Sequence, residues 1–262
     1  MRPILWTIGS LTISSYSFMA AIGFLAAVFI AILRAKKVGI WTKSIIDLSL
    51  YVFIGGLIGA RLFHKLQHFG SYNSISDALN IMEGGFAYYG GFISAFLIGI
   101  IYLKINRLSI AQIADIVAPS LAIGEGIGRI GCFMAGCCFG KPTDIMYGVS
   151  YPENSLVWTL IGSQKVHPTQ IYSAIALFCI FGMLMAIQKY TNFRGQLFLI
   201  FLLIHSVFRF SIDFLRYYTP EEHISILTTS QFISMIIGLG AVITMVIFIF
   251  NNRKSKARGQ PN

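Results

Sequence analysis

The sequence predicts an all-α membrane protein that crosses the bilayer about seven times, on three observations. Of its 262 residues, 56% are hydrophobic and only 11% are charged, and the mean hydropathy is +0.73. Several apolar runs approach the roughly 20 residues that a spanning helix needs. The basic residues behind the formal net charge of +10 fall mostly in short loops, so they indicate membrane topology and not nucleic-acid binding.

The apolar runs define the expected helices. Residues 1–15 are mildly apolar and rich in Ser and Thr, which predicts an interfacial lead-in. The first apolar run precedes a basic cluster and has no convincing cleavage site, so we expect a retained helix and not a removed signal peptide. Spanning helices are predicted over residues 16–33, 45–63, 86–103, 110–130, 169–187, 196–215 and 230–250.

Two segments fall outside these runs. The longest loop, 133–168, contains Pro142 and Pro152 and predicts a small external cap without a core of its own. The tail, 251–262, is polar and basic, so we expect a disordered cytoplasmic end near anionic lipid headgroups. No internal repeat is visible, and the whole chain, 1–262, is expected to form one integral membrane domain.

Lysine and arginine residues predict the orientation. They cluster in alternate short loops and in the tail and are scattered elsewhere, which places the amino terminus outside and the carboxyl terminus in the cytoplasm. With this topology, several polar helix ends share the outer leaflet: 59–61, 83–91, 128–131, 167–172 and 205–216.

The glycine-rich stretch that follows the apolar run 110–123 contains Arg129, a charge at or near membrane depth. An arginine left in hydrocarbon costs at least ~2.5–3.5 kcal/mol, so Arg129 needs an anionic partner. The surrounding glycines allow backbone N–H groups and helices to approach closely, as a phosphate or lipid headgroup site requires.

One face of the helix predicted over 196–215 carries polar residues spaced four, four and three apart: His205, Arg209, Asp213 and Arg216. One interpretation is a structural ion pair between Arg209 and Asp213, with Arg216 as a snorkelling anchor. However, Arg61 and Arg129 are expected on the same side of the membrane. Positive charge is then in excess, and a phosphodiester headgroup would complete the site through bidentate contacts.

Tyr88 and Tyr89 stand between two Gly-Gly pairs, 84–85 and 90–91. A hinge, a small-residue packing face and an aromatic belt explain these residues without any chemistry. Alternatively, Tyr89 donates a hydrogen bond to a phosphate oxygen. As a general base, an imidazole such as that of His205 is intrinsically better suited near neutral pH than a phenol.

The four cysteines of the chain, Cys132, Cys137, Cys138 and Cys179, are too few and too clustered for a disulfide framework. A metal or redox role is disfavoured, because the spacing is not C-x-x-C and no His pair lies at ligand spacing. We therefore expect no metal ion and no cofactor. A thiolate beside Arg129 stays open.

At these residues the chain resembles the bacterial prolipoprotein diacylglyceryl transferase family. Each matching stretch is short, but together their order and spacing are specific and cover nearly the whole chain. The matching stretches are the helix start at Tyr16, then 59–61, 83–91, Gly-Arg-Ile-Gly at 128–131, Gly-Lys-Pro-Thr at 140–143, 167–172, 209–216 and 228–234.

The resemblance implies a seven-helix inner-membrane enzyme with its active site toward the outer leaflet. It implies transfer of the diacylglyceryl group of phosphatidylglycerol to the lipobox cysteine thiol of a prolipoprotein signal peptide, with a thioether formed and glycerol phosphate released. The residues implied in catalysis are Arg129, Arg209, Tyr89 and His205. The residues implied in substrate binding are Tyr16, Arg61, Gly90, Gly91, Glu125, Cys132, Gly140, Gln170, Asp213 and Arg216.

The chain departs from the family pattern at several positions. A family histidine is Tyr89 here, an asparagine is Cys132, an acidic residue is Cys137 and a glutamate is Ser173, while His205 stands where a tyrosine is common. The general base is therefore open between Tyr89 and His205.

Other functions fit the same residues. A lipid-binding or transport protein would use the same basic cavity without chemistry. A membrane thiol oxidoreductase would use the cysteines, and a divergent family member would act on another acceptor.

Overall fold

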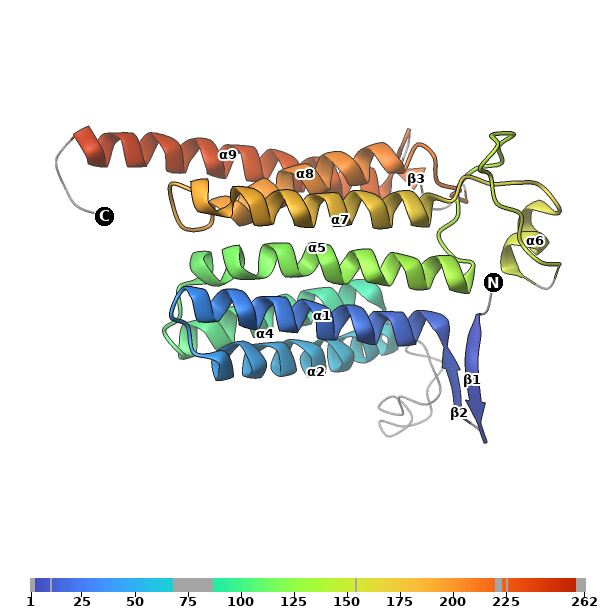
Figure 1. Cartoon of the computed structure of the whole chain (residues 1–262), viewed down its shortest axis with the longest axis horizontal. Helices are drawn as coiled ribbons and strands as arrows, with labels where there is room; N and C mark the ends of the chain where they lie inside the picture. The colour runs from blue at the N-terminus through green and yellow to red at the C-terminus, as the bar shows by residue number, and fades with distance from the viewer. Residues whose placement is uncertain are drawn as a thin grey trace. The chain divides into compact units, whose positions relative to one another are not determined.

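The computed structural model describes residues 3–9, 11–67, 87–153, 155–219, 223–224 and 226–257, and it is mostly helical (Figure 1). The helices are α1 (Ser15–Lys37), α2 (Thr42–Gln67), α4 (Tyr88–Ile105), α5 (Ile110–Ala135), α6 (Leu156–Ile161), α7 (Thr169–Ile187), the 3-10 turn η3 (Gln188–Tyr190), α8 (Gln196–Ile212) and α9 (Thr229–Ala257). Two antiparallel pairs join β1 (Ile4–Ile8) to β2 (Leu11–Ser14) and β3 (His223–Ile224) to β4 (Leu227–Thr228).

Within the described residues, 5 helices are long and apolar enough to cross a membrane, namely α1, α2, α5, α7 and α9. Helices α4 and α8 are apolar but shorter. The expectation of a mostly helical chain with several candidate spans is confirmed. The short strand pairs are an addition to the all-α expectation, and the seven crossings and the orientation of the termini stay predictions.

The predicted helix bounds differ most at the polar ends. Helix α7 matches its predicted range, whereas α5 continues through the glycine-rich stretch to Ala135 and α8 stops at Ile212. The expectation of a disordered tail from residue 251 is wrong as far as Ala257, because α9 continues to that residue. Lys, Arg and Ala are good helix formers, so the helix extends beyond its apolar part.

The chain forms two compact units, one of residues 31–113 and the other of residues 1–30 with 114–262. The boundary falls within α1 and within α5, and each unit is described by itself. The expected single domain over 1–262 stays a prediction.

In the unit 31–113, α2 and α4 pack closely through small residues. A Cβ at Gly90 would meet the Gly59 carbonyl oxygen at 2.8 Å, and one at Gly91 would meet Ala60 Cβ at 3.0 Å. The Ala87 N–H also donates to the Ala60 carbonyl oxygen. Such close approach favours van der Waals contact between helices where both face lipid.

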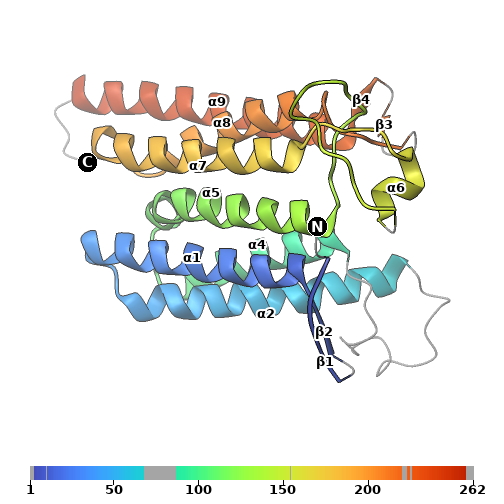
Figure 2. The same ribbon diagram turned by 45° about the vertical axis from the view of Figure 1, so that its right-hand side comes forward.

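In the other unit, α1 crosses α5 at glycines. A Cβ at Gly23 would lie 2.5 Å from the Gly124 carbonyl oxygen, and one at Gly131 would lie 3.3 Å from Tyr16 Cα. Helices α7, α8 and α9 run side by side in both views (Figures 1 and 2). The buried core shared by α5, α7 and α8 is apolar: Ala118, Ala122, Ile180, Leu184, Leu197 and Phe201.

The segment 133–168 has a small core, so the expectation of a cap without one is wrong. The aromatic and β-branched residues Phe139, Tyr151, Val157 and Val166 are buried together. Short bridges pair Val166 with residues on two other turns of the segment, which supplies the backbone bonds that a loop otherwise lacks. The apolar side chains of the cap come from several short turns, and together they form its core.

Candidate functional site

Helices α5 and α8 meet at the carboxylate of Glu125. Arg129, one turn further along α5, donates from Nη2 to Glu125 Oε1 at 2.9 Å. His205 of α8 places Nε2 2.9 Å from Glu125 Oε2. Glu125 therefore contacts the guanidinium of Arg129 from its own helix and the imidazole of His205 from the neighbouring helix. Spacing by four residues aligns Glu125 and Arg129 on one helix face.

Arg209 lies one turn beyond His205 on α8 and forms an ion pair with Asp213. Its Nη2 also donates to the Tyr218 hydroxyl at 3.0 Å and to Ser230 Oγ at 2.8 Å. The guanidinium groups of Arg209 and Arg129 are near enough for their positive charges to repel one another. The structure thus brings together the two arginines expected in catalysis, on neighbouring helices of one unit.

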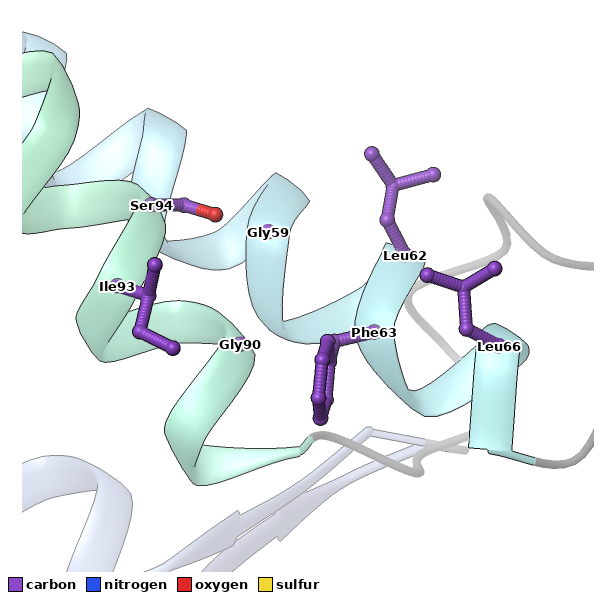
Figure 3. Close-up of a pocket in the computed structure, with 7 residues that line it drawn as sticks. All are labelled: Gly59, Leu62, Phe63, Leu66, Gly90, Ile93 and Ser94. Carbon is purple, nitrogen blue, oxygen red and sulfur yellow. The ribbon is translucent and has the colours of Figure 1, made fainter.

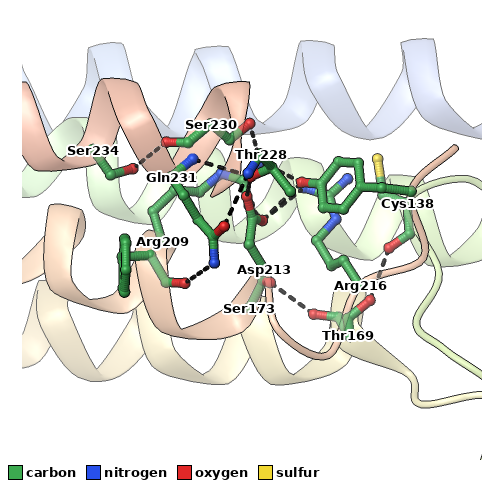
Figure 4. Close-up of polar contacts among 12 residues, drawn as sticks. Cys138, Thr169, Ser173, Arg209, Asp213, Arg216, Thr228, Ser230, Gln231 and Ser234 are labelled. Atoms are coloured by element: carbon green, nitrogen blue, oxygen red, sulfur yellow. Dashed lines mark hydrogen bonds and ion pairs between the residues drawn. The ribbon is translucent and has the colours of Figure 1, made fainter. Parts of the chain in front are cut away.

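Asp213 organises the end of α8 and the start of α9 (Figure 4). Its side chain is fully buried, and it accepts hydrogen bonds from Thr228 Oγ1 at 2.8 Å and from the Tyr218 hydroxyl at 2.7 Å. Arg216 Nη1 lies 3.9 Å from the same carboxylate. The guanidinium of Arg216 lies over the Tyr218 ring. These contacts support the structural ion-pair interpretation for Asp213, whose carboxylate fixes two arginines in place.

The sequence analysis assigned no site role to three polar partners in this cluster, Tyr218, Thr228 and Ser230, although the last two lie in the matching stretch 228–234. The available signal was the Thr-x-Ser-Gln stretch that opens an otherwise apolar helix. Gln231, the last residue of that stretch, accepts from the Thr228 N–H at 3.0 Å and donates to the Phe210 carbonyl oxygen. Polar side chains at the head of a membrane helix are costly unless partnered, so such a stretch predicts a polar contact.

Taken together, the described residues of this cluster contain more positive than negative charge. The guanidinium groups of Arg129, Arg209 and Arg216 lie near only two carboxylates, those of Glu125 and Asp213. All five side chains are partly or fully buried, where uncompensated charge is expensive. The arrangement therefore suits a bound anion, which arginines would hold by charge-assisted hydrogen bonds.

The loop that follows α5 is held by the start of α7. Gln170 is buried and donates from Nε2 to the Cys137 carbonyl oxygen at 2.7 Å and to the Tyr151 hydroxyl at 2.9 Å. Burial raises the pKa of Tyr151 to about 12, so its phenol stays neutral in this contact. Thr169 Oγ1 donates to the Cys138 carbonyl oxygen at 2.8 Å. Gln170, expected in substrate binding, thus contacts the protein's own loop.

Gly140 lies in a tight crossing between chain segments. Its N–H donates to the His167 carbonyl oxygen, and a Cβ at this position would lie 2.6 Å from that oxygen and 2.8 Å from the Leu215 carbonyl oxygen. A side chain therefore has no room, which explains the glycine by packing. Gly140 also pairs with Arg216 in an isolated β-bridge, next to the cationic cluster.

Tyr16 and Cys132 lie at the contact of α1 with α5. The Tyr16 hydroxyl interacts electrostatically with Cys132 and Arg129, and the Tyr16 side chain is 49% exposed. Cys132 is 7% exposed. Both expected binding residues are therefore near Arg129.

The remaining predicted residues, Arg61, Tyr89, Gly90 and Gly91, belong to the other unit. Arg61 is 2% exposed and Tyr89 is 49% exposed. Gly90 lines an apolar groove of about 200 Å³ between α2 and α4 (Figure 3). The close packing of Gly90 and Gly91 supports the small-residue interpretation, and the grouping of these four residues with Arg129 stays a prediction. Glu83 lies outside the described residues.

The fold and the cluster define a class, a multi-pass helical membrane protein with a partly buried cationic site. The family model for prolipoprotein diacylglyceryl transferase matches residues 3–247. The chain belongs to the prolipoprotein diacylglyceryl transferase family, as the resemblance in the sequence indicated.

Curated relatives match most of the chain or nearly all of it. The phosphatidylglycerol–prolipoprotein diacylglyceryl transferase of Clostridium tetani is 34% identical over 96% of this chain and 97% of its own. A relative of the same name from Clostridium perfringens, numbered 2, is 31% identical over 98% of each chain. One from Thermotoga maritima is 33% identical over 81% of this chain and 73% of its own.

Proposed function

We propose that this chain transfers the diacylglyceryl group of phosphatidylglycerol to the lipobox cysteine thiol of a prolipoprotein, with release of glycerol phosphate. The names and the full-length coverage of the relatives support this activity. The structural observation that carries it is the pair Arg129 and Arg209, held on neighbouring helices in a cluster with excess positive charge. A phosphodiester supplies the missing negative charge.

The reaction is a displacement at carbon. The acceptor sulfur loses its proton and forms a bond to the glycerol carbon of the diacylglyceryl group, while the carbon–oxygen bond to the phosphate breaks and glycerol phosphate leaves. The substrate supplies the nucleophile, so the enzyme must position the two substrates and stabilise the leaving phosphate. Arg129 and Arg209 perform the second task.

The general base is His205 in this proposal. Glu125 lies 2.9 Å from its Nε2, so the carboxylate orients the ring and stabilises the imidazolium that forms when the ring takes a proton. Tyr89 is the competing base. The two assignments differ in the expected effect of His205→Asn, which abolishes proton removal only if His205 is the base.

The other predicted residues divide by their contacts. Asp213 and Gln170 are positioning residues, because each binds an arginine or a loop carbonyl of the protein. Gly140 permits the tight crossing next to Arg216, where a side chain has no room. Glu125, expected in substrate binding, is a positioning residue as well, because it binds Arg129 and His205 of the protein. The proposed substrate contacts are Tyr16, Arg61, Gly90, Gly91, Cys132 and Arg216.

The proposed setting is the bacterial inner membrane, with the site toward the outer leaflet and the carboxyl terminus in the cytoplasm. The clustering of lysine and arginine residues supports this orientation. The candidate spans support several crossings, and the signal peptide of the acceptor would enter from the bilayer.

Arg209→Ala provides the test. The purified protein is mixed with phosphatidylglycerol vesicles and a lipobox peptide, and the mass gain of the peptide is measured. We expect Arg209→Ala to lower the rate by at least about 100-fold, because one leaving-group contact is lost. Arg194→Ala removes an exposed arginine just before α8 and should leave the rate unchanged.

Survival of the rate in Arg209→Ala would exclude the assigned role. Movement of lipid without any peptide mass gain in the unmodified protein would favour the alternative of lipid transport. A mass gain on other thiol peptides only would favour a divergent acceptor.

A further inference from the structure

Three cysteines, Cys132, Cys137 and Cys138, lie close together in space. Cys132 lies in the last turn of α5, and the chain then turns at Gly136, which has a φ of +76°, so that Cys137 and Cys138 fold back toward the helix. The Cys137 N–H donates to the Cys132 carbonyl oxygen at 3.1 Å. As a result, the three Sγ atoms all lie within 4.8 Å of one another.

The loop that carries these thiols is held in an unfavourable backbone conformation. Cys138 has a φ of +60°, a left-handed conformation that is unfavourable for a residue with a Cβ. Thr169 of α7 donates a hydrogen bond of 2.8 Å to the Cys138 carbonyl oxygen (Figure 4). Gln170, the next residue of α7, donates one of 2.7 Å to the Cys137 carbonyl oxygen. Strain that the surroundings maintain in this way is typical of functional sites, where it fixes the direction of a side chain.

The spacing of the sulfur atoms suits a thiophilic metal ion. Around a tetrahedral zinc ion with Zn–S bonds of about 2.3 Å, the sulfur atoms lie about 3.8 Å apart. Sulfur atoms already within 4.8 Å of one another reach that separation by side-chain rotation. Thiolates are soft ligands that select Zn²⁺ and Cu⁺ over Mg²⁺ and Ca²⁺.

The surrounding charges suit such a site as well. Three thiolates around one divalent ion have a net charge of −1, which is costly in a partly buried setting unless cations lie nearby. Arg129 and Arg216 both interact electrostatically with Cys138. These two cations therefore lie where a tri-thiolate centre would need them.

We propose that Cys132, Cys137 and Cys138 form a binding site for a single thiophilic metal ion, of which Zn²⁺ is the expected occupant. The three protein ligands leave a fourth position for water, as in zinc sites that are not purely structural. Thr169 and Gln170 are the supporting residues, because they fix the backbone of two ligands. The competing explanation is a cluster of neutral thiols that hydrogen-bond one another and bind nothing.

Metal binding by the full-length protein in detergent tests the proposal. The thiols are reduced with a phosphine, Zn²⁺ is added, and bound zinc is measured after removal of the free ion. Binding of one zinc ion per chain is expected, and Co²⁺ should give a sulfur-to-cobalt charge-transfer absorption. Absence of zinc binding by the folded protein would overturn the proposal.

Serine variants assign the ligands. Cys132→Ser, Cys137→Ser and Cys138→Ser should each weaken zinc binding by at least about 100-fold, since each removes one of three ligands. Cys179→Ser is the matched control, because Cys179 lies on α7 and is exposed. Unchanged binding in the first three variants, or an equal loss in Cys179→Ser, would contradict the assignment.

A second measurement uses the unmodified protein, so it does not depend on the folding of variants. The protein is labelled with N-ethylmaleimide with and without Zn²⁺, and each cysteine is quantified by mass spectrometry. Zinc should protect Cys137 and Cys138, the partly exposed thiols of the cluster, and leave the labelling of the exposed Cys179 unchanged; equal labelling in both conditions would exclude the site. Neither experiment contains phosphatidylglycerol or peptide, so failure here leaves the proposed transfer reaction untouched.

Discussion

Two acidic residues of α5, Asp115 and Glu125, contact α8 at different places along its length. The two acids differ in the groups that they bind. Near the start of α8, Asp115 accepts from the Gly195 N–H at 2.6 Å and from the Phe198 N–H at 2.9 Å. At the other end, Glu125 faces the side chains of Arg129 and His205. The same chemical group meets backbone donors in one place and titratable or charged side chains in the other.

The difference separates an acid that caps a helix from an acid that lies in the proposed site, and we call the two places the structural end and the functional end of the contact. The first N–H groups of a helix have no partner within the helix and carry partial positive charge, so Asp115 satisfies a need that every helix start has. Glu125 instead lies in a cluster that keeps positive charge in excess through Arg129, Arg209 and Arg216. Only the second end has a reason to bind an anion, and variants at the two ends should therefore fail in different ways.

The largest effect is expected at Asp213, the buried acid of the functional end. Asp213→Ala leaves Arg209 and Arg216 buried without their carboxylate, and removal of one member of a buried ion pair typically costs about 3–5 kcal/mol. We expect a marked loss of thermal stability in detergent together with loss of transfer activity. A variant that unfolds at the temperature of the unmodified protein would show that the carboxylate does not hold the arginines.

The next effect is expected on activity. Glu125→Gln keeps the shape of the side chain but removes its charge, so His205 is oriented less well and Arg129 loses its ion pair. Loss of such an orienting group typically lowers activity by about 10- to 100-fold. The measurement is the initial rate of peptide mass gain at saturating phosphatidylglycerol, with the melting temperature as a check on folding. An unchanged rate would remove Glu125 and His205 from the proposed proton transfer.

Short-range patterns in the sequence predicted part of the cationic cluster. The four-residue spacing of Arg209 and Asp213 predicted their contact, because residues so spaced share a helix face. The family stretches placed Arg129 and Arg209 among the expected catalytic residues. The range of α7 was also predictable, since a polar start and a long apolar run determine both of its ends.

The sequence patterns could not predict contacts between residues that are far apart in the chain. His205 and Glu125 are 80 residues apart in the chain, and no local periodicity relates them. The same holds for Thr228 with Asp213 and for the core of the cap, which combines aromatic residues from separate turns. The three cysteines were considered together, but a metal role was disfavoured because their spacing is not C-x-x-C. A spacing rule describes common loops, whereas here left-handed turns at Gly136 and Cys138 bring the thiols together.

The smallest effect is expected at the structural end and completes the comparison. In Asp115→Asn one carboxylate oxygen becomes an NH₂ group, which faces a backbone N–H that it cannot satisfy, so one of the contacts at the start of α8 is lost. Loss of a capping contact costs about 0.5–2 kcal/mol. We expect a small drop in melting temperature and an unchanged rate of peptide mass gain, because the cluster at the far end of α8 keeps its charges. If Asp115→Asn slowed the reaction as much as Glu125→Gln does, the two acids would act as one unit, and the distinction between the ends of the α5–α8 contact would be wrong.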